Sequence, residues 1–230
     1  MEFNIEKYHL KSTSLFDFLT PNESQLIKNK LVRMEFLKGD SLFKENSFSK
    51  GIYIVRKGKV KIFQTNSEGK ESIVYFYKKG DYFGYRPLLA NEPHPVSAVA
   101  MDNVVISFMP KELFSSILAT SSNLARHLLI VLSKEFSVWI NKMTVFSQYG
   151  VKERVALSLL ILNKVYQRAE NDNALNISIN RDDFAGFVGT AKETLVRMLR
   201  IFKDEKIITT KGTKIIILKH KVLLDMVADM

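Results

Sequence analysis

Near its C-terminal end the chain reads Asn180-Arg-Asp-Asp-Phe-Ala-Gly-Phe-Val-Gly-Thr-Ala-Lys-Glu-Thr-Leu-Val-Arg-Met-Leu-Arg-Ile-Phe-Lys203, a pattern that predicts two short helices joined by a tight turn. The first helix has an apolar side, formed by Phe184, Phe187 and Val188 at helical spacing. Gly189 ends this helix, because glycine tolerates the left-handed conformation of a C-cap. In the second helix, residues that must face inward recur at i, i+3, i+4 and i+7: Leu195, Met198, Leu199 and Phe202.

The start of the second helix is predicted from a capping box, Thr190-Ala-Lys-Glu193. In such a box the Thr190 hydroxyl and the Glu193 carboxylate accept hydrogen bonds from backbone N–H groups that the helix leaves free. The outward positions are mostly basic: Lys192, Glu193, Arg197, Arg200 and Lys203. A helix with Lys, Glu and Arg near its N-terminus, braced by a shorter helix, is typical of a major-groove reader. The alternative is a solvated helix with an i,i+4 pair between Glu193 and Arg197.

The segment after these helices predicts a β-hairpin around a Lys211-Gly212 turn, because β-branched residues flank it in Ile207-Ile-Thr-Thr-Lys-Gly-Thr-Lys-Ile-Ile-Ile-Leu218. Helix, turn, helix and basic hairpin together make a winged helix-turn-helix. From Lys192 to Lys221 there are nine Lys and Arg against three acids, a net of +6 out of the formal +10 of the chain. Neutralising phosphates requires such a concentration of charge, so DNA binding is favoured over the solvated helix.

Composition limits the class of protein. A length of 230 residues predicts one or two domains at about 150 residues each, and a hydrophobic content of 46% is enough for a sizeable core. The chain has no Cys, which excludes disulfides, thiolate metal sites, iron–sulfur clusters and cysteine nucleophiles. No apolar run approaches the roughly 20 residues that span a bilayer, and the first residues lack the order of a secretory signal. We therefore expect a cytoplasmic protein without a membrane segment.

The N-terminal half has a β-rich pattern. Short helices are predicted at 14–19 and 21–30, the second with Thr20 as N-cap and Pro21 at its first position. From Arg33 to Met109, glycine turns separate short β-branched and aromatic runs, among them 51–55, 60–63 and 72–77. Such strands predict a closed sandwich or barrel, wide enough to hold one small molecule.

A long helical pattern follows from about Lys111 to Phe146, with two apolar stripes. One stripe repeats every seven residues (Leu124, Val131, Val138, Val145), and the other contains Leu128, Leu132, Trp139, Met143 and Phe146. One stripe can pack on the chain's own barrel while the other meets a second copy of the helix, as in a coiled-coil seam. The alternative is a helix buried within one domain. We expect a homodimer, because two-fold-related modules need two recognition helices about 34 Å apart on a duplex.

In this order, from about Leu31 to Leu218, the elements resemble the Crp/Fnr family of bacterial transcription regulators. The most specific similarity is Val188-Gly-Thr-Ala-Lys-Glu-Thr-Leu-Val-Arg-Met-Leu, against a family pattern of Val-Gly, two or three small or polar residues and Arg-Glu-Thr-x-x-Arg. The runs Tyr53-Ile-Val-x-x-Gly58 and Lys79-Gly-Asp-Tyr-Phe-Gly84 resemble the cyclic-nucleotide-binding β-roll of the family.

The resemblance implies an α+β fold: an N-terminal double-stranded β-helix, or β-roll, at 1–110, a long dimerisation helix at 111–146 and a C-terminal winged helix-turn-helix at 147–230. A further helix from Val151 to Arg168 and a polar loop at 168–174 belong to the last part. The resemblance also implies a sequence-specific regulator, not an enzyme, that binds a palindromic promoter site in double-stranded DNA as a homodimer. RNA polymerase is the expected further partner, near the loop at 170–173.

Residue by residue, the base-reading Glu and Arg of the family fall at Glu193 and Arg197. An Arg guanidinium donates twice to guanine O6 and N7, and a Glu carboxylate accepts from cytosine N4. Lys192 stands where the best-known member has Arg, and a lysine lacks the bidentate geometry. Thr194 keeps a hydroxyl at a position where the family contacts phosphate. The remaining expected phosphate contacts, each with a plain surface role as the alternative, are Arg200, Lys211 and Lys214.

The expected effector pocket departs from the cyclic-AMP pattern of the family. There, a Gly-Glu-Leu run supplies the Glu that holds the ribose, and an Arg-Ser-Ala run supplies the Arg that holds the cyclic phosphate. Here the matching runs are Gly84-Tyr85-Arg86 and Val96-Ser97-Ala98. A phosphate buried without its cation is costly, so we expect no cyclic-AMP binding in the usual pose unless Arg86 supplies the charge. The roll binds another, unidentified small-molecule effector or none.

Two other function classes remain. One is a small-molecule-binding regulatory protein whose helix-turn-helix contacts protein, and the other is a cupin-type metalloenzyme. The second needs clustered histidines, but the four present (9, 94, 127 and 220) are scattered. We expect no metal and no cofactor. His94, between two prolines, is expected in a loop, and His127 in the core or seam of the long helix.

Overall fold

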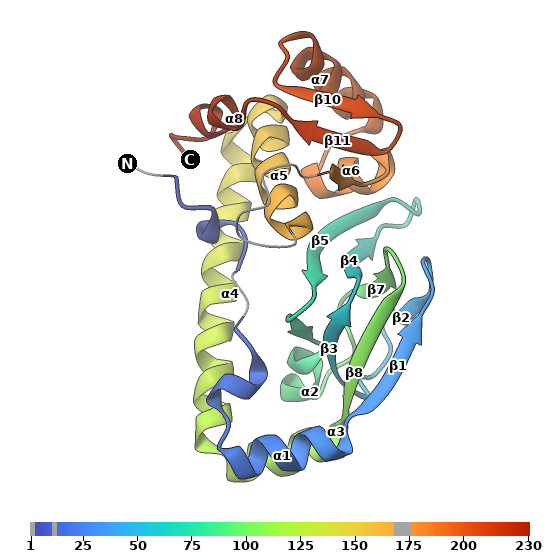
Figure 1. The fold of residues 1–230 in the computed structure, drawn as a ribbon, viewed down its shortest axis with the longest axis vertical. Helices are drawn as coiled ribbons and strands as arrows, with labels where there is room; N and C mark the ends of the chain where they lie inside the picture. Colours follow the sequence, from blue (N-terminus) through green and yellow to red (C-terminus); the bar gives the residue numbers. More distant parts are fainter. Residues whose placement is uncertain (1–2, 11–12, 168–175) are drawn as a thin grey trace. The chain divides into compact units, whose positions relative to one another are not determined.

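The computed structural model of the chain describes residues 3–10, 13–167 and 176–230 (Figure 1). By compactness the chain divides into two units. One contains the described residues of 1–10, 66–73 and 135–230, and the other those of 11–65 and 74–134. The domain boundaries at 110/111 and 146/147 stay predictions. The predicted polar loop at 168–174, with residues 170–173, lies outside the described residues.

Of the N-terminal helices, α1 begins where the sequence places it, η2 begins one residue later than predicted, and η1 was not predicted. The 3-10 helices are η1 (Ile5–Lys7) and η2 (Leu15–Phe18), and α1 spans Pro21–Lys30. The Thr20 hydroxyl accepts from the backbone N–H of Glu23, and the Glu23 carboxylate accepts from that of Thr20 at 2.8 Å. This capping box, with Pro21 in the first turn, confirms the predicted start of α1.

The roll is built from two antiparallel sheets, ordered β1-β8-β3-β6 and β2-β7-β4-β5 in the described part of the chain (Figure 1). The strands are β1 (Val32–Phe36), β2 (Ser41–Phe43), β3 (Gly51–Lys57), β4 (Lys59–Thr65), β5 (Glu71–Lys78), β6 (Tyr82–Phe83), β7 (Ser97–Ala100) and β8 (Val104–Pro110). Side chains of both sheets share one core, in which Tyr53, Val55 and Ile106 meet Leu42 and Ile62. The predicted strands at 51–55, 60–63 and 72–77 are therefore confirmed as part of a closed β-roll.

The helix predicted over 111–146 is in fact two helices, α3 (Lys111–Thr120) and α4 (Ser122–Gln148). The break falls at Ser121, whose backbone N–H still bonds the Ile117 carbonyl, at 2.8 Å. Its hydroxyl then accepts from the backbone N–H of Leu124, at 3.2 Å. A serine in this position acts as the N-cap of the next helix, so the chain turns there.

The exposed apolar face of α4 differs from the predicted second stripe. The heptad positions Leu124, Val131, Val138 and Val145 are buried, as is Leu128, while Leu132 and Trp139 are half-buried. Exposed instead are Leu129, Phe136, Ile140 and Met143, at 65%, 67%, 48% and 68%. These four residues, named the α4 apolar face below, are spaced by seven, four and three residues, so they share one side of the helix. Of the predicted stripe, Met143 and Phe146 are exposed.

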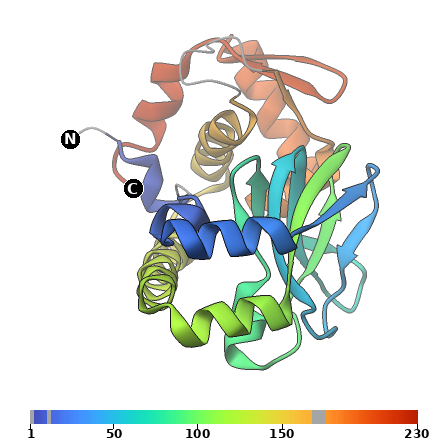
Figure 2. The same ribbon diagram turned by 60° about the horizontal axis from the view of Figure 1, so that its bottom comes forward.

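The C-terminal part contains α5 (Val151–Tyr166), β9 (Asn176–Ser178), α6 (Arg181–Val188), α7 (Lys192–Asp204), β10 (Ile208–Lys211), β11 (Lys214–Ile217) and α8 (His220–Met226). The strands pair in the order β10-β11-β9. Phe184, Leu195 and Phe202 are buried completely, as is Ile215 on β11. The hairpin thus packs with α6 and α7 around one core, with α8 on the other side of α5 (Figures 1 and 2). Among the described residues, no helix has the length and apolar character to cross a membrane.

Candidate nucleic-acid interface

The turn between α6 and α7 is fixed by backbone geometry. Asn180 caps α6 by accepting from the backbone N–H of Asp183, at 2.7 Å. Gly189 ends α6 with φ of 69°, a left-handed conformation that favours glycine, so the predicted C-cap is confirmed. The backbone N–H groups of Gly189 and Thr190 both donate to the Ala185 carbonyl, at 2.9 and 3.1 Å. The chain therefore reverses within three residues before α7 begins.

The predicted capping box at the start of α7 is wrong. Ala191, not Thr190, is the N-cap, and no side chain caps the helix. The reason is that Thr190 still belongs to the end of α6, through its bond to Ala185. The first helical bond of α7 runs from the Leu195 N–H to the Ala191 carbonyl, at 3.0 Å. Glu193 consequently lies at the second helical position, and its carboxylate is not used for capping.

The inward side of α7 agrees with the predicted spacing. Leu195, Leu199 and Phe202 are buried, while Met198, predicted to face inward, is only half-buried. Thr194 is half-buried as well. The α7 outer face, as it is called below, comprises the exposed residues Lys192, Glu193, Val196, Arg197 and Arg200.

Two residues of the α7 outer face have charged partners. The Lys192 ammonium donates to the Asp182 carboxylate of α6 at 2.9 Å, and Arg200 lies 3.9 Å from Asp204. Both pairs are largely exposed to solvent, so each contributes little to stability. Within the described chain, Glu193 and Arg197 form no ion pair with each other or with another residue, so the solvated i,i+4 pair is not observed.

Two arginines that the sequence interpretation missed brace this region. Arg154, on α5, donates to the Gly189 carbonyl at 3.3 Å, where a cation also meets the negative end of the α6 dipole. Arg181, at the first position of α6, donates to the Gly212 carbonyl at the tip of the hairpin, at 3.1 Å. Both acceptors are backbone carbonyls more than thirty positions away, so no local pattern marks these arginines.

The hairpin places its two lysines opposite each other. Lys211 and Lys214 are partners in the β10–β11 register, on either side of Gly212 and Thr213. Gly212 has φ of 60°, which a two-residue hairpin turn requires. Both lysines are exposed, and no described residue forms an ion pair with either.

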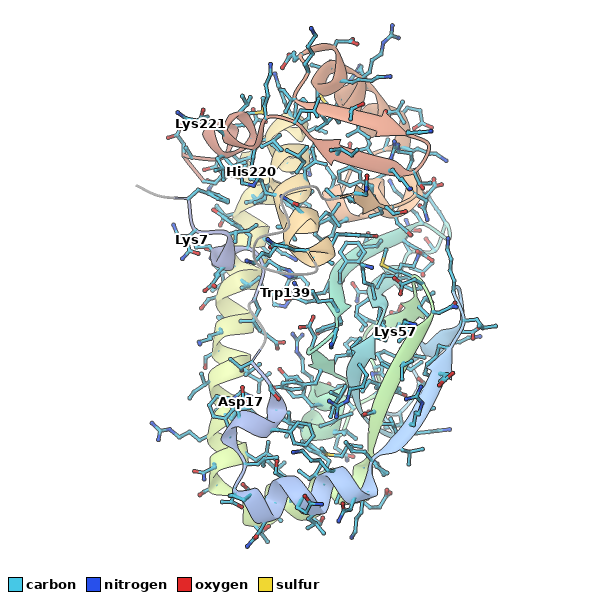
Figure 3. All side chains as sticks on the ribbon, viewed as in Figure 1. Lys7, Asp17, Lys57, Trp139, His220 and Lys221 are labelled. Carbon is cyan, nitrogen blue, oxygen red and sulfur yellow. The ribbon has the colours of Figure 1, made fainter. Side chains whose placement is uncertain are left out.

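Not every cation in the basic segment faces the same way. Lys219 donates to the Glu205 carbonyl at 2.9 Å, beyond the C-terminal end of α7. Lys221 and His220, labelled in Figure 3, begin α8 on the other side of α5 from the hairpin. The charge that surrounds the α7 outer face is therefore smaller than the net of +6 counted over 192–221.

The two runs of the expected effector pocket meet in the core of the roll. Gly84 has φ of 90°, and a Cβ there would lie 3.0 Å from the Gly51 carbonyl and 3.1 Å from the Tyr53 ring. Tyr85 is buried, whereas Arg86 is exposed on the first turn of α2 (Tyr85–Ala90).

The second run is part of the same packed interior. Ala98 is buried completely, Val96 packs against the same cluster, and the Ser97 hydroxyl accepts from the backbone N–H of Glu45 at 3.0 Å. Stacked rings occupy the centre: Phe83 lies 5.3 Å from Tyr53 and 4.6 Å from Tyr77.

Two histidines, His94 in the roll and His127 on α4, are buried. His94 stacks on Phe43 at 3.7 Å between ring centroids, and burial lowers the pKa of His94 to about 4. His94 lies in a loop, as predicted, but is only 2% exposed. His127 is a core residue that shares a hydrogen bond of 2.9 Å with the Tyr82 hydroxyl. In the part of the chain that the structure describes, no three His, Asp or Glu side chains gather as a metal site would require.

Comparisons with known proteins agree with this architecture. Residues 33–121 match the cyclic nucleotide-binding domain family, and residues 153–226 match the Crp-like helix-turn-helix domain family. The fumarate and nitrate reduction regulatory protein of Vibrio cholerae is 25% identical over 225 residues, covering 95% of this chain and 90% of that protein. The transcriptional activator protein Anr of Pseudomonas protegens is 28% identical over 182 residues, covering 79% of this chain and 74% of Anr.

Solved structures share the fold over most of their length. A Crp/Fnr-family transcriptional regulator from Eubacterium rectale superposes with a TM-score of 0.74 at 22% identity, covering 94% of this chain and 98% of that one. FixK2 from Bradyrhizobium japonicum superposes with a TM-score of 0.76 at 20% identity, covering 85% and 96%. The roll, the helix-turn-helix and the matched relatives together show that the chain belongs to the Crp/Fnr family of DNA-binding transcription regulators and is not an enzyme.

Proposed function

We propose that the chain is a homodimeric regulator that places α7 in the major groove of a palindromic promoter site. The observation that carries this proposal is the pair of Glu193 and Arg197, which stand one helical turn apart on the α7 outer face, exposed and without an ion-pair partner in the described chain. An arginine in this state can donate twice to guanine O6 and N7, and a carboxylate can accept from cytosine N4. Neither group has to give up a strong contact in order to bind a base.

The other predicted residues are assigned to the DNA backbone. Lys211 and Lys214 project from the tip of the hairpin, and Arg200 lies one turn beyond Arg197 on α7. Thr194 supplies a hydroxyl near the start of the same helix. Lys192 reaches DNA only by leaving Asp182, and an exposed pair of this kind is cheap to break. Contacts of this type fix register and carry no sequence information by themselves.

The α4 apolar face is the surface proposed for the homodimer. Leu129, Phe136 and Met143 repeat every seven residues and are each about two-thirds exposed. A heptad stripe of large exposed side chains is typical of a helix that pairs with a second helix. Two α7 helices, about 34 Å apart, can then read the two halves of a palindrome.

The roll is proposed to sense something other than cyclic AMP, or to have no effector. A cyclic phosphate in the usual pose would lie where Val96 replaces the arginine of the family, beside the buried Ala98 and the stacked rings. Arg86, the candidate to supply the missing positive charge, is exposed on α2. Since a buried phosphate needs a cation, this interior favours an apolar or aromatic effector.

We further propose that bound protein contacts RNA polymerase and that it works in the cytoplasm, where promoter DNA lies.

The test is DNA binding by the full chain with one side chain removed at a time. A palindromic duplex is selected from a random pool, and affinity is measured by fluorescence anisotropy at fixed salt. Arg197→Ala should cost about 1–3 kcal/mol for each half-site and relax preference at one base pair. Lys221→Ala, which removes the same charge from α8, is the matched control and should leave base preference unchanged. If Arg197→Ala and Lys221→Ala behave alike, α7 does not read DNA, and a role in protein contacts replaces this proposal.

A further inference from the structure

One residue of the α7 outer face has no charge and no hydrogen-bonding side chain. Val196 is 47% exposed. All residues of α7 are described, and no other large hydrophobic residue of this helix is exposed. Val196 immediately precedes Arg197. Its neighbours at i−4, i−3 and i+4 on the helix surface are Lys192, Glu193 and Arg200. The two methyl groups of Val196 therefore lie beside side chains assigned to DNA, with the buried Leu199 at i+3 on the inward side.

Stability gives no reason for a valine at this position. A β-branched side chain loses rotamer freedom in a helix, so an exposed helical position favours Ala, Lys, Glu or Arg over Val. Burial does not compensate, since Leu195, Leu199 and Phe202 already form the inward side of α7. An apolar group on the outer face is available to an apolar partner outside the chain.

The major groove offers one such group. Guanine, cytosine and adenine present donors and acceptors there, whereas thymine also presents its C5 methyl group. With α7 in the groove, as proposed above, Val196 on the same outer face as Glu193 and Arg197 faces the DNA. We propose that Val196 recognises a thymine by packing its methyl groups against the thymine C5 methyl, next to the base pair that Arg197 reads.

This proposal rests on the proposed function, because it requires α7 in the major groove. It adds a rule of specificity: the operator half-site contains a thymine whose methyl group, rather than its hydrogen-bonding edge, is read. Glu193 and Arg197 distinguish cytosine and guanine, and neither can detect a methyl group.

The experiment removes the methyl group from DNA and from protein separately. Each thymine of the selected palindrome is replaced in turn by deoxyuridine, at symmetric positions, which deletes the C5 methyl and keeps both base-pairing and groove hydrogen bonds. Binding is measured for the wild-type chain, Val196→Ala and Arg197→Ala. Alanine is a better helix former than valine, so Val196→Ala is expected to fold, and thermal unfolding by circular dichroism verifies this.

At one thymine position, we expect deoxyuridine to weaken wild-type binding about fourfold when one half-site is changed, which is the value of one buried methyl group. Changing both half-sites should weaken binding about fifteenfold. Val196→Ala should bind thymine and deoxyuridine equally at that position, and Val196→Thr, which keeps one methyl, should retain part of the difference. If Val196→Ala keeps the full deoxyuridine effect, or if no thymine is sensitive in the wild type, the inference is wrong. If the thymine inference fails in this way but Arg197→Ala still loses base preference, the proposed function stands. If Arg197→Ala has no effect on binding or base preference, both the inference and the proposed function are wrong.

Discussion

The ion pair between Lys192 and Asp182 predicts that removing an acidic residue strengthens DNA binding. The pair measures 2.9 Å and joins α6 to the first position of α7, with side-chain exposures of 49% and 73%. Exposed pairs contribute about 0.2–1 kcal/mol, so this is the cost that Lys192 meets when it turns to DNA. Asp182→Asn removes that cost in advance. Affinity should rise about 1.4- to 5-fold for each subunit, and about 2- to 30-fold for a dimer on two half-sites.

The variant has a small, opposite effect on folding. Asp182 lies in the first turn of α6, where a negative charge favours the helix dipole by about 0.3–1 kcal/mol. The free energy of unfolding should therefore fall slightly while DNA affinity rises. Asp183 remains in the same turn to accept the Asn180 amide at 2.7 Å, so α6 keeps its N-cap.

Fluorescence anisotropy on the selected palindrome, at two salt concentrations, measures the gain. Asp225→Asn is the matched control, because it removes the same charge from α8. The decisive variant is the double substitution Asp182→Asn with Lys192→Ala, in which the gain should disappear. A gain that persists without Lys192, or that Asp225→Asn reproduces, would refute the pairing argument and leave only a general effect of net charge. No gain at all would mean that Lys192 stays on Asp182 in the complex.

Three further predictions concern the roll and α4. Phe136→Glu puts a charge on the α4 apolar face and should shift sedimentation from dimer to monomer. Asn123→Glu, elsewhere on α4, is the control and should leave the dimer intact. A dimer that persists in Phe136→Glu would exclude the α4 apolar face as the dimer interface. Cyclic AMP should leave the melting temperature unchanged, and a large saturable rise would overturn the argument from Val96 and Arg86. Because burial lowers the pKa of His94 from 6.5 to about 4, the unfolded chain binds a proton there that the folded chain does not. The free energy of unfolding should therefore fall by up to about 3 kcal/mol from pH 6.5 to pH 4. Urea titrations should show a smaller fall for His94→Phe than for the wild type. An equal fall in the two proteins would contradict the argument.

Local signals in the sequence were enough for the parts of the fold that depend on neighbouring residues. The spacing of Leu195, Leu199 and Phe202 predicted the buried side of α7. Gly189 predicted the turn between α6 and α7. Both features depend on a few consecutive positions. Thr20 and Glu23 predicted the start of α1 for the same reason. The order of the β-rich half, the long helix and the helix-turn-helix followed from these local patterns, and the family resemblance then implied the fold that joins them.

Contacts between distant residues left no such signal. Arg181 donates to a carbonyl 31 positions away, and Lys192 pairs with an acid on another helix. The face of α4 was also misjudged, since two apolar stripes on one helix look alike in sequence. Burial shows which residues face outward: Leu128 of the second predicted stripe is 2% exposed, whereas Leu129, which neither stripe included, is 65% exposed.

The error at the start of α7 bears directly on the proposed site. With Thr190 as N-cap, the Glu193 carboxylate would be held against the backbone of its own helix and kept from DNA. The helix instead begins one residue later, because the Thr190 N–H is used by α6 through the Ala185 carbonyl. Glu193 then lies in the first turn, where the helix dipole favours its charge, and its oxygens remain available to accept from a base. The sequence pattern assigns the Glu193 carboxylate two roles, helix capping and base reading, which exclude each other. The turn between α6 and α7 leaves Glu193 out of capping, so its carboxylate is available for base reading.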